Sequence, residues 1–136
     1  MALTELPGTS DNDVINGTDA DEHITGLAGN DIIHGNGGND TIEGGSGNDT
    51  ISGGAGTDIL TGGTGIDIFM DTAAYLNGDT ITDMLPGDRL VFTDTTLNQG
   101  NINILFTGNV MSFNGGSVTV SNLGPGRFVT RSITGG

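Results

Sequence analysis

Residues 44–61 read GGSGNDTIS and GGAGTDILT, which are two consecutive copies of one nine-residue unit. The shared pattern is G-G-x-G-x-D-x-U-x, in which U is a large apolar residue. Outward from these copies the same phase holds for seven units, which begin at Gly8, Gly17, Gly26, Gly35, Gly44, Gly53 and Gly62. The array therefore runs without slippage from Gly8 to Met70. A repeat this regular predicts a solenoid, in which every unit adopts the same local structure.

Two positions of the unit have a fixed chemical character. The sixth is acidic in all seven copies: Asp13, Glu22, Asp31, Asp40, Asp49, Asp58 and Asp67. The eighth is apolar in all seven: Ile15, Ile24, Ile33, Ile42, Ile51, Leu60 and Phe69. The glycine-rich hexapeptide supplies a tight turn, because glycine adopts positive φ at little cost, and the last three residues form one short strand. Two units then close one coil, so that unit n lies beneath unit n+2 at the strand spacing of about 4.8 Å. We expect the apolar residues to face inward as two ladders and the acidic residues to line up along each edge.

The array resembles the calcium-binding nonapeptide repeat of RTX proteins, which are secreted bacterial toxins, proteases, lipases and epimerases. The resemblance implies an all-β fold, a right-handed parallel β-roll (β-solenoid) with a C-terminal capping β-sheet. It divides the chain into an N-terminal lead-in at residues 1–7, a calcium-binding roll at residues 8–70 and a β-rich cap at residues 71–136 that continues the roll. Units three and four have Leu27 and Asn36 in place of the second glycine. Units one and two depart further, since Asp11 and Ala20 replace the glycine at the fourth position, and we expect weaker sites there.

Calcium is a hard cation that takes six to eight oxygen ligands at about 2.3–2.6 Å, and a glycine turn can aim backbone carbonyls at one point. By the family pattern, each ion lies between the turns of units n and n+2 and is bound by turn carbonyls and by both sixth-position carboxylates. The resemblance thus implies three strong sites, which pair Asp31 with Asp49, Asp40 with Asp58, and Asp49 with Asp67. Weaker sites pair Asp13 with Asp31 and Glu22 with Asp40. The implied turn ligands are Leu27, Gly29, Gly35, Asn36, Gly37, Gly38, Gly44, Gly45, Ser46, Gly47, Gly53, Ala55, Gly62 and Thr64. We expect about three to five Ca²⁺ ions, coupled through shared carboxylates.

The distribution of charge agrees with a cation-binding array. Residues 1–70 contain twelve acidic residues and no Lys or Arg, whereas residues 71–136 contain five acidic residues and three arginines. Nucleic acid and anionic membranes are therefore poor partners. The array has few large apolar residues to oppose its backbone entropy, and its stacked carboxylates repel one another without a metal. We expect the array to be disordered without calcium and folded with it.

The second half of the chain has a different pattern. Residues 78–92 resemble the segment that follows the roll in RTX proteases, in which an I-x-D-F stretch leads through a Gly-Asp turn into a short strand; Met84 stands where that pattern has Phe. Asp79, Asp83 and Asp88 are possible ligands of a last site, but surface or turn aspartates are the favoured interpretation. Short β-rich runs at residues 101–106, 110–113, 117–121 and 127–133 predict a small sheet that covers the end of the roll.

Catalytic motifs are absent from the sequence. It has no H-E-x-x-H, no G-x-S-x-G and no cysteine, so we expect that it is not an enzyme. His23 and His34 occupy the seventh and ninth repeat positions on opposite faces, which predicts ordinary exposed histidines. The absence of cysteine also excludes a disulfide framework, and no apolar run reaches the length of a membrane span.

The favoured function is a calcium-binding module that folds outside the cell. By resemblance it is the folding- and export-promoting C-terminal part of a larger protein that leaves the cell unfolded through type I secretion, with an upstream domain as its partner. The alternative is an extracellular recognition module for a polysaccharide or a surface, as in adhesins and alginate epimerases, or one that self-associates. The sequence has no Trp, one Tyr (Tyr75) and three Arg, a poor supply of sugar-stacking and basic groups, which favours the first function.

Overall fold

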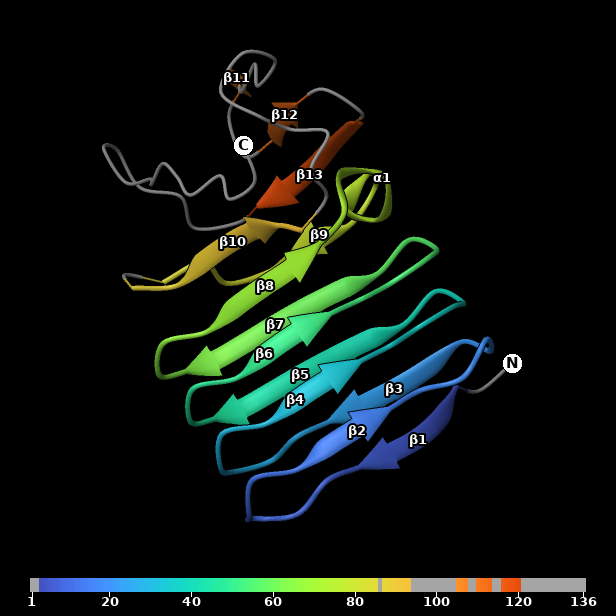
Figure 1. Cartoon of the computed structure of the whole chain (residues 1–136), viewed down its shortest axis with the longest axis vertical. Helices are drawn as coiled ribbons and strands as arrows, with labels where there is room; N and C mark the ends of the chain where they lie inside the picture. Colours follow the sequence, from blue (N-terminus) through green and yellow to red (C-terminus); the bar gives the residue numbers. More distant parts are fainter. Residues whose placement is uncertain (1–2, 86, 94–104, 108–109, 114–115, 121–136) are drawn as a thin grey trace.

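Two mainly parallel sheets face each other in the computed structural model, and from β1 to β10 the chain alternates between them (Figure 1). The structure describes residues 3–85, 87–93, 105–107, 110–113 and 116–120. The five-stranded sheet has the order β10-β8-β6-β4-β2, and the eight-stranded sheet has the order β1-β3-β5-β7-β9-β13-β12-β11. This is the predicted all-β parallel β-roll.

The strands are short, as a three-residue segment after each turn predicts. The five-stranded sheet contains β2 (Val14–Asn16), β4 (Ile32–His34), β6 (Thr50–Ser52), β8 (Ile68–Asp71) and β10 (Arg89–Phe92). The eight-stranded sheet contains β1 (Thr4–Pro7), β3 (Glu22–Thr25), β5 (Thr41–Ser46), β7 (Ile59–Thr64), β9 (Thr80–Ile81), β11 (Leu105–Thr107), β12 (Val110–Phe113) and β13 (Gly116–Val120). The segment predicted as an N-terminal lead-in thus contributes β1, which pairs in parallel with β3.

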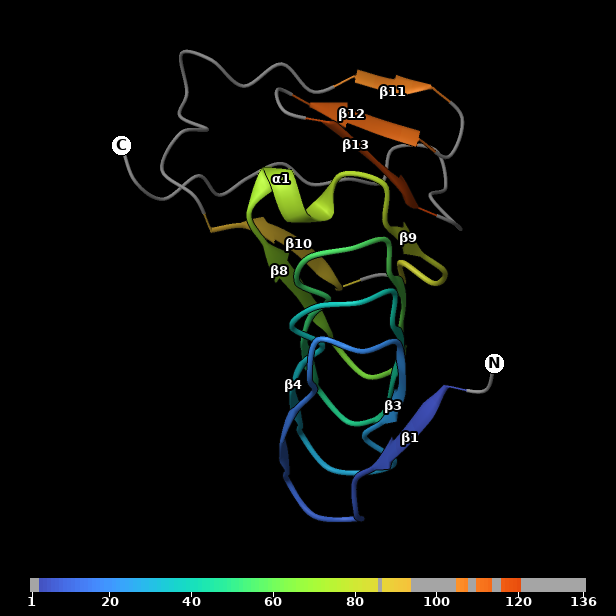
Figure 2. The same cartoon turned by 90° about the vertical axis from the view of Figure 1, so that its right-hand side faces the viewer.

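The register between coils equals two repeat units. Ile33 pairs with Ile51 in one sheet and Ile42 pairs with Leu60 in the other, each eighteen residues further along. The eighth-position side chains from Ile24 to Phe69 are at most 1 % exposed and fill the space between the sheets. Seen at right angles to the first view, the coils form a stack of flattened loops with the two sheets on either side (Figure 2). Each fully buried Ile or Leu contributes roughly 1.5–3 kcal/mol to this core.

The coil pattern continues past Met70 as β9 and β10, although the nine-residue spacing is interrupted there. The helix α1 (Ala73–Leu76) adds three residues to the eighth turn, so Ile59 pairs with Thr80, twenty-one residues on. Ile81 is fully buried in the row of eighth-position residues, and Leu90 packs against the same core. Two further acidic-x-apolar segments therefore extend the roll as β9 and β10.

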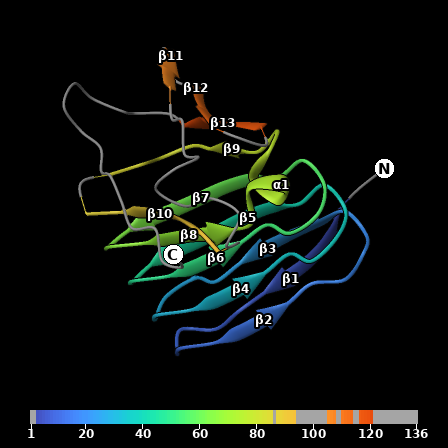
Figure 3. The same cartoon turned by 45° about the horizontal axis from the view of Figure 1, so that its top comes forward.

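The cap belongs to the same sheet as the roll. β13 pairs in parallel with β9, and β11, β12 and β13 pair in antiparallel fashion. Leu76 and Val120 join the core cluster of the roll, and α1 lies across the upper end of the coils (Figure 3). The strands predicted at residues 110–113 and 117–121 overlap β12 and β13, and the last two residues of the strand predicted at 101–106 lie in β11. Residues 101–104 and 121 of these predictions, and the strand predicted at residues 127–133, lie outside the described residues.

Candidate metal sites at the turns

The acidic residues form two rows, one at the entrance to each sheet. One row contains Asp13, Asp31, Asp49, Asp67 and Asp88, and the other contains Glu22, Asp40, Asp58 and Asp79. From unit two to unit eight these side chains are at most 1 % exposed, and Asp88 is 5 % exposed. In the described residues, no salt bridge from a lysine or arginine reaches these carboxylates, so their burial requires another source of compensation.

One oxygen of each buried carboxylate is used to stack the coils. The backbone N–H of the acidic residue in unit n donates to Oδ1 of the acidic residue in unit n+2. Examples are Asp31 to Asp49, at an N···O distance of 2.8 Å, and Asp40 to Asp58, also at 2.8 Å. These contacts bring together the three pairs that the sequence predicted for the strong sites, since Asp49 donates to Asp67 in the same way.

The second oxygen has no partner at the turns of six successive units. Within the described residues, buried Oδ2 atoms without a hydrogen-bond donor belong to Asp31, Asp40, Asp49, Asp58, Asp67 and Asp79. An unsatisfied buried acceptor costs about 1–3 kcal/mol, and more when it is charged. Oxygens that are buried, anionic and repeated at each coil are suited to bind a hard cation.

The first glycine of the unit opens space next to this oxygen. A β-carbon on Gly35 would lie 2.5 Å from Asp40 Oδ2 and 2.6 Å from the carbonyl oxygen of Gly53 in the coil above. At Gly44 the corresponding atoms are Asp49 Oδ2 and the Gly62 carbonyl oxygen. A carboxylate oxygen and a first-position carbonyl thus converge on one point that only glycine leaves free. The predicted first-position ligands Gly44, Gly53 and Gly62 lie at these points.

Carbonyls of the other predicted turn ligands also point along the stack. The carbonyl oxygens of Leu27 and Asn36 accept hydrogen bonds from the N–H groups of Ser46 and Ala55, at 2.9 and 2.6 Å. The carbonyls of Gly29, Gly38, Gly45 and Gly47 lie against the α-carbons of the equivalent glycines one coil later, and Thr64 O accepts from Gly47 N at 3.0 Å. Leu27 and Asn36 adopt φ of +77° and +76°, so the turn keeps its left-handed conformation even where glycine is replaced. Leucine tolerates this conformation less well than asparagine.

The electrostatic state of the ladder reflects its burial. The pKa of Asp40 is raised from its ordinary value of 3.8 to about 7, and those of Asp58 and Asp67 are raised to about 6, with desolvation as the main cause. These values already include the N–H bond from the coil beneath, which lowers the pKa, and the neighbouring carboxylates, which raise it. Burial likewise raises the pKa of Asp49. A bound divalent cation would favour the ionised forms that burial disfavours.

Units one and two satisfy their acidic side chains differently. Thr9 donates its N–H to Asp13 Oδ2 at 2.6 Å, and its hydroxyl donates to the same carboxylate at 3.0 Å. Thr18 contacts Glu22 through the same two groups, with an N–H···Oε1 distance of 2.9 Å. Asp11 and Ala20, which replace the glycine at the fourth position, do not adopt positive φ. These carboxylates are therefore occupied by protein donors, consistent with the weaker sites expected here.

Asp79 and Asp88 lie at turns, since their N–H groups donate to the carbonyls of Leu76 and Leu85 at 3.1 Å. A surface position is wrong for both, because Asp79 is fully buried and Asp88 nearly so, and both accept an N–H from the acidic ladder. The signal that identifies them is the nine-residue spacing between them and the apolar residue two positions after each. Asp83 is half-buried and accepts from the N–H groups of Gly62 and Gly63 at 2.8 and 2.9 Å.

A second ladder, at the fifth position, was not anticipated. The side-chain oxygens of Asn12, Asn30 and Asn48 accept the backbone N–H of the residue eighteen positions later, at 2.7–2.8 Å. Asp21 and Asn39 do the same on the opposite edge, at 2.7 and 2.9 Å. These bonds hold the outer side of each turn and leave the inner side to the acidic ladder.

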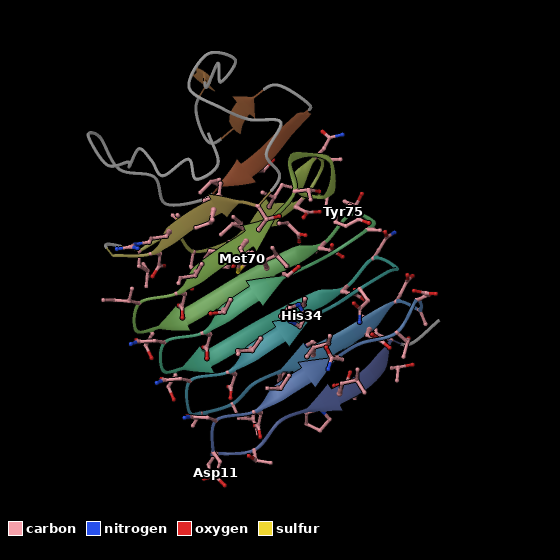
Figure 4. All side chains as sticks on the ribbon, in the orientation of Figure 1. Asp11, His34, Met70 and Tyr75 are labelled. Atoms are coloured by element: carbon pink, nitrogen blue, oxygen red, sulfur yellow. The ribbon has the colours of Figure 1, made fainter. Side chains whose placement is uncertain are left out.

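The histidines lie apart, as predicted, but His23 is not simply exposed. His23, on β3, is half-buried and contacts Glu5 through Nδ1 at 2.9 Å and Glu43 through Nε2 at 2.6 Å. The hydrogen bond to Glu43 is the main cause that raises the pKa of His23. His34 lies on the outer face of the other sheet, in the row that also holds Met70 (Figure 4).

The donor set available to a cation at the turns consists of two carboxylates and backbone carbonyls. In the part of the chain that the structure describes, no three Asp, Glu, His or Cys side chains gather into a metal-binding group. Calcium accepts backbone carbonyls readily and does not need a cluster of side chains. The unpartnered Oδ2 atoms, the converging first-position carbonyls and the all-oxygen donor set fit Ca²⁺.

The sequence profile of the RTX calcium-binding nonapeptide repeat, four copies long, matches residues 7–42 and again residues 34–69. Residues 7–69 are RTX calcium-binding repeats. Repeats of this kind bind Ca²⁺, form a structural module and are typical of secreted bacterial proteins. A comparison with curated proteins gave no match. The matched residues end at Phe69, so Asp79 and Asp88 lie outside the RTX match.

Proposed function

We propose that this RTX module folds when it binds Ca²⁺ outside the cell and thereby promotes the folding and export of a larger secreted protein. The observation that supports it most strongly is the set of buried Oδ2 atoms without a donor at six successive turns. These oxygens bind the metal ion instead of accepting hydrogen bonds from the protein. The metal-free roll is accordingly unstable, and the metal-bound roll is complete.

The ligand assignment follows the contacts of the ladder. Three ions lie between the turns of units three and five, four and six, and five and seven. Their carboxylates come from Asp31, Asp40, Asp49, Asp58 and Asp67, and their carbonyls come from the glycine turns that carry these residues. Asp49 serves two of the three ions, which couples their binding. Weaker ions at Asp13 and Glu22 must compete with the hydrogen bonds from Thr9 and Thr18.

Coupling of folding to calcium follows from the energetics. A site that is filled at about 100 times its Kd stabilises the folded state by roughly 2.7 kcal/mol, so three or more sites supply the stability of a typical domain. A chain of this kind is unfolded where calcium is scarce, which suits passage through an export channel, and folds where calcium is abundant. No helix in the described residues is long and apolar enough to span a bilayer.

The test is a titration of the whole chain with Ca²⁺ and with Mg²⁺, followed by calorimetry. We expect about three to five Ca²⁺ ions to bind cooperatively and Mg²⁺ to fail, because Mg²⁺ demands octahedral geometry at about 2.0–2.1 Å and retains its waters. Equal binding of both ions, or binding of neither, contradicts the proposal.

A second candidate function, docking to a surface or to another copy, is favoured by one observation. Val14 and Ile32 pair in register on the outer face of the five-stranded sheet and are 67 % and 43 % exposed, and Ile68 lies further along the same row. Exposed β-branched rows on a flat sheet are suited to association. Sedimentation of the calcium-bound protein distinguishes the two, since Val14→Lys/Ile32→Lys should abolish any dimer and leave calcium binding unchanged.

A further inference from the structure

We propose that a further Ca²⁺ ion binds between Asp58 and Asp79, beyond the repeats of the RTX match, and fastens the cap to the roll. The inference rests on the proposed function, because it assumes that the acidic ladder binds calcium. It adds a site at the junction with the cap and a role for that site. The ion completes a surface that the cap strands need for docking.

Asp79 has the same environment as the ladder residues inside the repeats. It is fully buried, its Oδ1 accepts the N–H of Asp58 at 2.8 Å, and its Oδ2 is buried without a donor. Asp58 is also fully buried and also has an unpartnered Oδ2. The pair therefore presents two buried oxygens without donors, as Asp40 and Asp58 do one coil earlier.

The backbone of Asp79 connects three parts of the molecule. Its N–H donates to the carbonyl of Leu76 at the end of α1, at 3.1 Å, and its carbonyl accepts the N–H of Thr119 in β13, at 2.9 Å. Its side chain accepts the N–H of Asp58 in the roll. An ion that fixes the Asp79 carboxylate therefore also fixes the attachment points of α1 and of the cap strand.

Burial is the main cause that raises the pKa of Asp79 to about 8, and the nearby Asp58 and Asp71 also raise it. A divalent cation between Asp58 and Asp79 would favour the ionised form that burial disfavours.

The neighbouring aspartates provide the contrast. Asp88 ends the other row of the ladder, and its Oδ2 accepts the N–H of Leu85 at 2.9 Å. Both oxygens of Asp83 accept backbone N–H groups, from Gly62 and Gly63. These carboxylates are satisfied by the protein itself, so the need for a metal at this end of the roll is specific to Asp79.

The test uses terbium(III), a luminescent substitute for Ca²⁺, with Tyr75 as the sensitiser. Tyr75 is the single tyrosine of a chain without tryptophan, and it lies on α1, four residues before Asp79 (Figure 4). Excitation of Tyr75 should therefore produce terbium emission chiefly from the junction ion. We expect Asp79→Asn to lose most of that emission and about one bound Ca²⁺ ion per chain, with cap residues becoming accessible to protease. Asp83→Asn is the matched control and should retain both, and Tyr75→Phe should remove the emission alone.

Three outcomes overturn the proposal. These are the absence of Tyr75-sensitised emission from the wild-type protein, a value for Asp79→Asn equal to wild type, and an equal loss for Asp83→Asn. The wild-type measurement decides the matter even if Asp79→Asn does not fold. Asp49→Asn, measured in parallel, separates this inference from the proposed function. If Asp49→Asn loses ions and Asp79→Asn does not, only the junction site is rejected; if neither loses ions, the acidic ladder itself is not the calcium site.

Discussion

The first two turns of the roll and the turns that follow have the same repeat phase but satisfy their acidic residues in opposite ways. In units one and two, Thr9 and Thr18 donate two hydrogen bonds each to Asp13 and Glu22. From unit three onward, each ladder aspartate through Asp79 has one buried oxygen with no donor. The same position of the same repeat is therefore satisfied by protein donors at one end and leaves one oxygen without a donor in the middle.

The two groups of turns differ in backbone conformation at the second and fourth residues of the unit. From unit three to unit seven both residues adopt positive φ, as at Leu27 with φ of +77° and Gly29 with φ of +102°. Thr9, Asp11, Thr18 and Ala20 do not adopt positive φ. The second-position threonine there donates to the acidic residue, and its hydroxyl oxygen accepts the backbone N–H of the residue two positions on, at 3.1 Å in both turns. Under the proposed function, this difference in backbone conformation determines which turns require an ion.

The largest expected effect comes from the middle of the ladder. Asp49→Asn should raise the calcium midpoint of folding at least roughly tenfold, equivalent to about 1.4 kcal/mol, because Asp49 serves two ions. Asp13→Asn is the matched control, and it should change the midpoint little, since Thr9 already satisfies Asp13. Calcium titrations followed by circular dichroism measure both, and equal shifts would contradict the difference between the two regions.

The pH dependence should be the next largest effect. In chelator, the raised pKa values of Asp40, Asp58 and Asp67 mean that the folded roll retains protons that the unfolded chain releases. The stability of the metal-free roll is then greatest below about pH 4 and is lost as the pH rises through about 6 to 7. With calcium present, the midpoint should rise on acidification, because protons compete with the ion.

Circular dichroism at pH 5 and pH 8, with chelator and with calcium, checks both directions. Asp13→Asn serves as the control and should leave this pH dependence unchanged. A gain of β-structure in the metal-free protein as the pH rises would contradict the predicted pH dependence.

Particular residues show which structural features the sequence predicted and which it did not. The nine-residue phase predicted the register, the buried row from Ile24 to Phe69 and the pairing of Asp31 with Asp49, because each depends only on the period. The insertion that forms α1 shifted that phase by three residues and concealed Asp79. The unpartnered oxygens could not be predicted from the sequence either, because they depend on whether the second residue of the unit donates a hydrogen bond to the carboxylate.

A conversion of unit two should produce a smaller, positive effect. Thr18→Gly/Ala20→Gly/Glu22→Asp gives that turn the composition of the central units. We expect about one additional Ca²⁺ ion, shared with Asp40. Calorimetric stoichiometry measures it, with Thr18→Ser as the control that keeps the hydroxyl. An unchanged ion count would mean that the fourth-position glycine does not set the difference.

The smallest effect concerns backbone strain within the metal-dependent region. Leu27 has φ of +77° and is 51 % exposed, so Leu27→Gly relieves strain and loses little packing. The relief of about 1–2 kcal/mol is partly offset by the entropy of glycine, which leaves roughly 0.5–1 kcal/mol of added stability. Asn36→Gly should give almost none, because asparagine tolerates this conformation. Thermal melting in saturating calcium compares the two, and a larger gain at Asn36 would reject the strain argument.

The most direct test of the central claim is the state of the whole chain in chelator at pH 8. The buried carboxylates from Asp31 to Asp79 predict a mainly disordered chain that gains β-structure cooperatively as Ca²⁺ is added, and that does not respond to Mg²⁺. Circular dichroism across the titration measures it. The same folded spectrum in chelator and in saturating calcium would contradict the claim that the metal completes this fold.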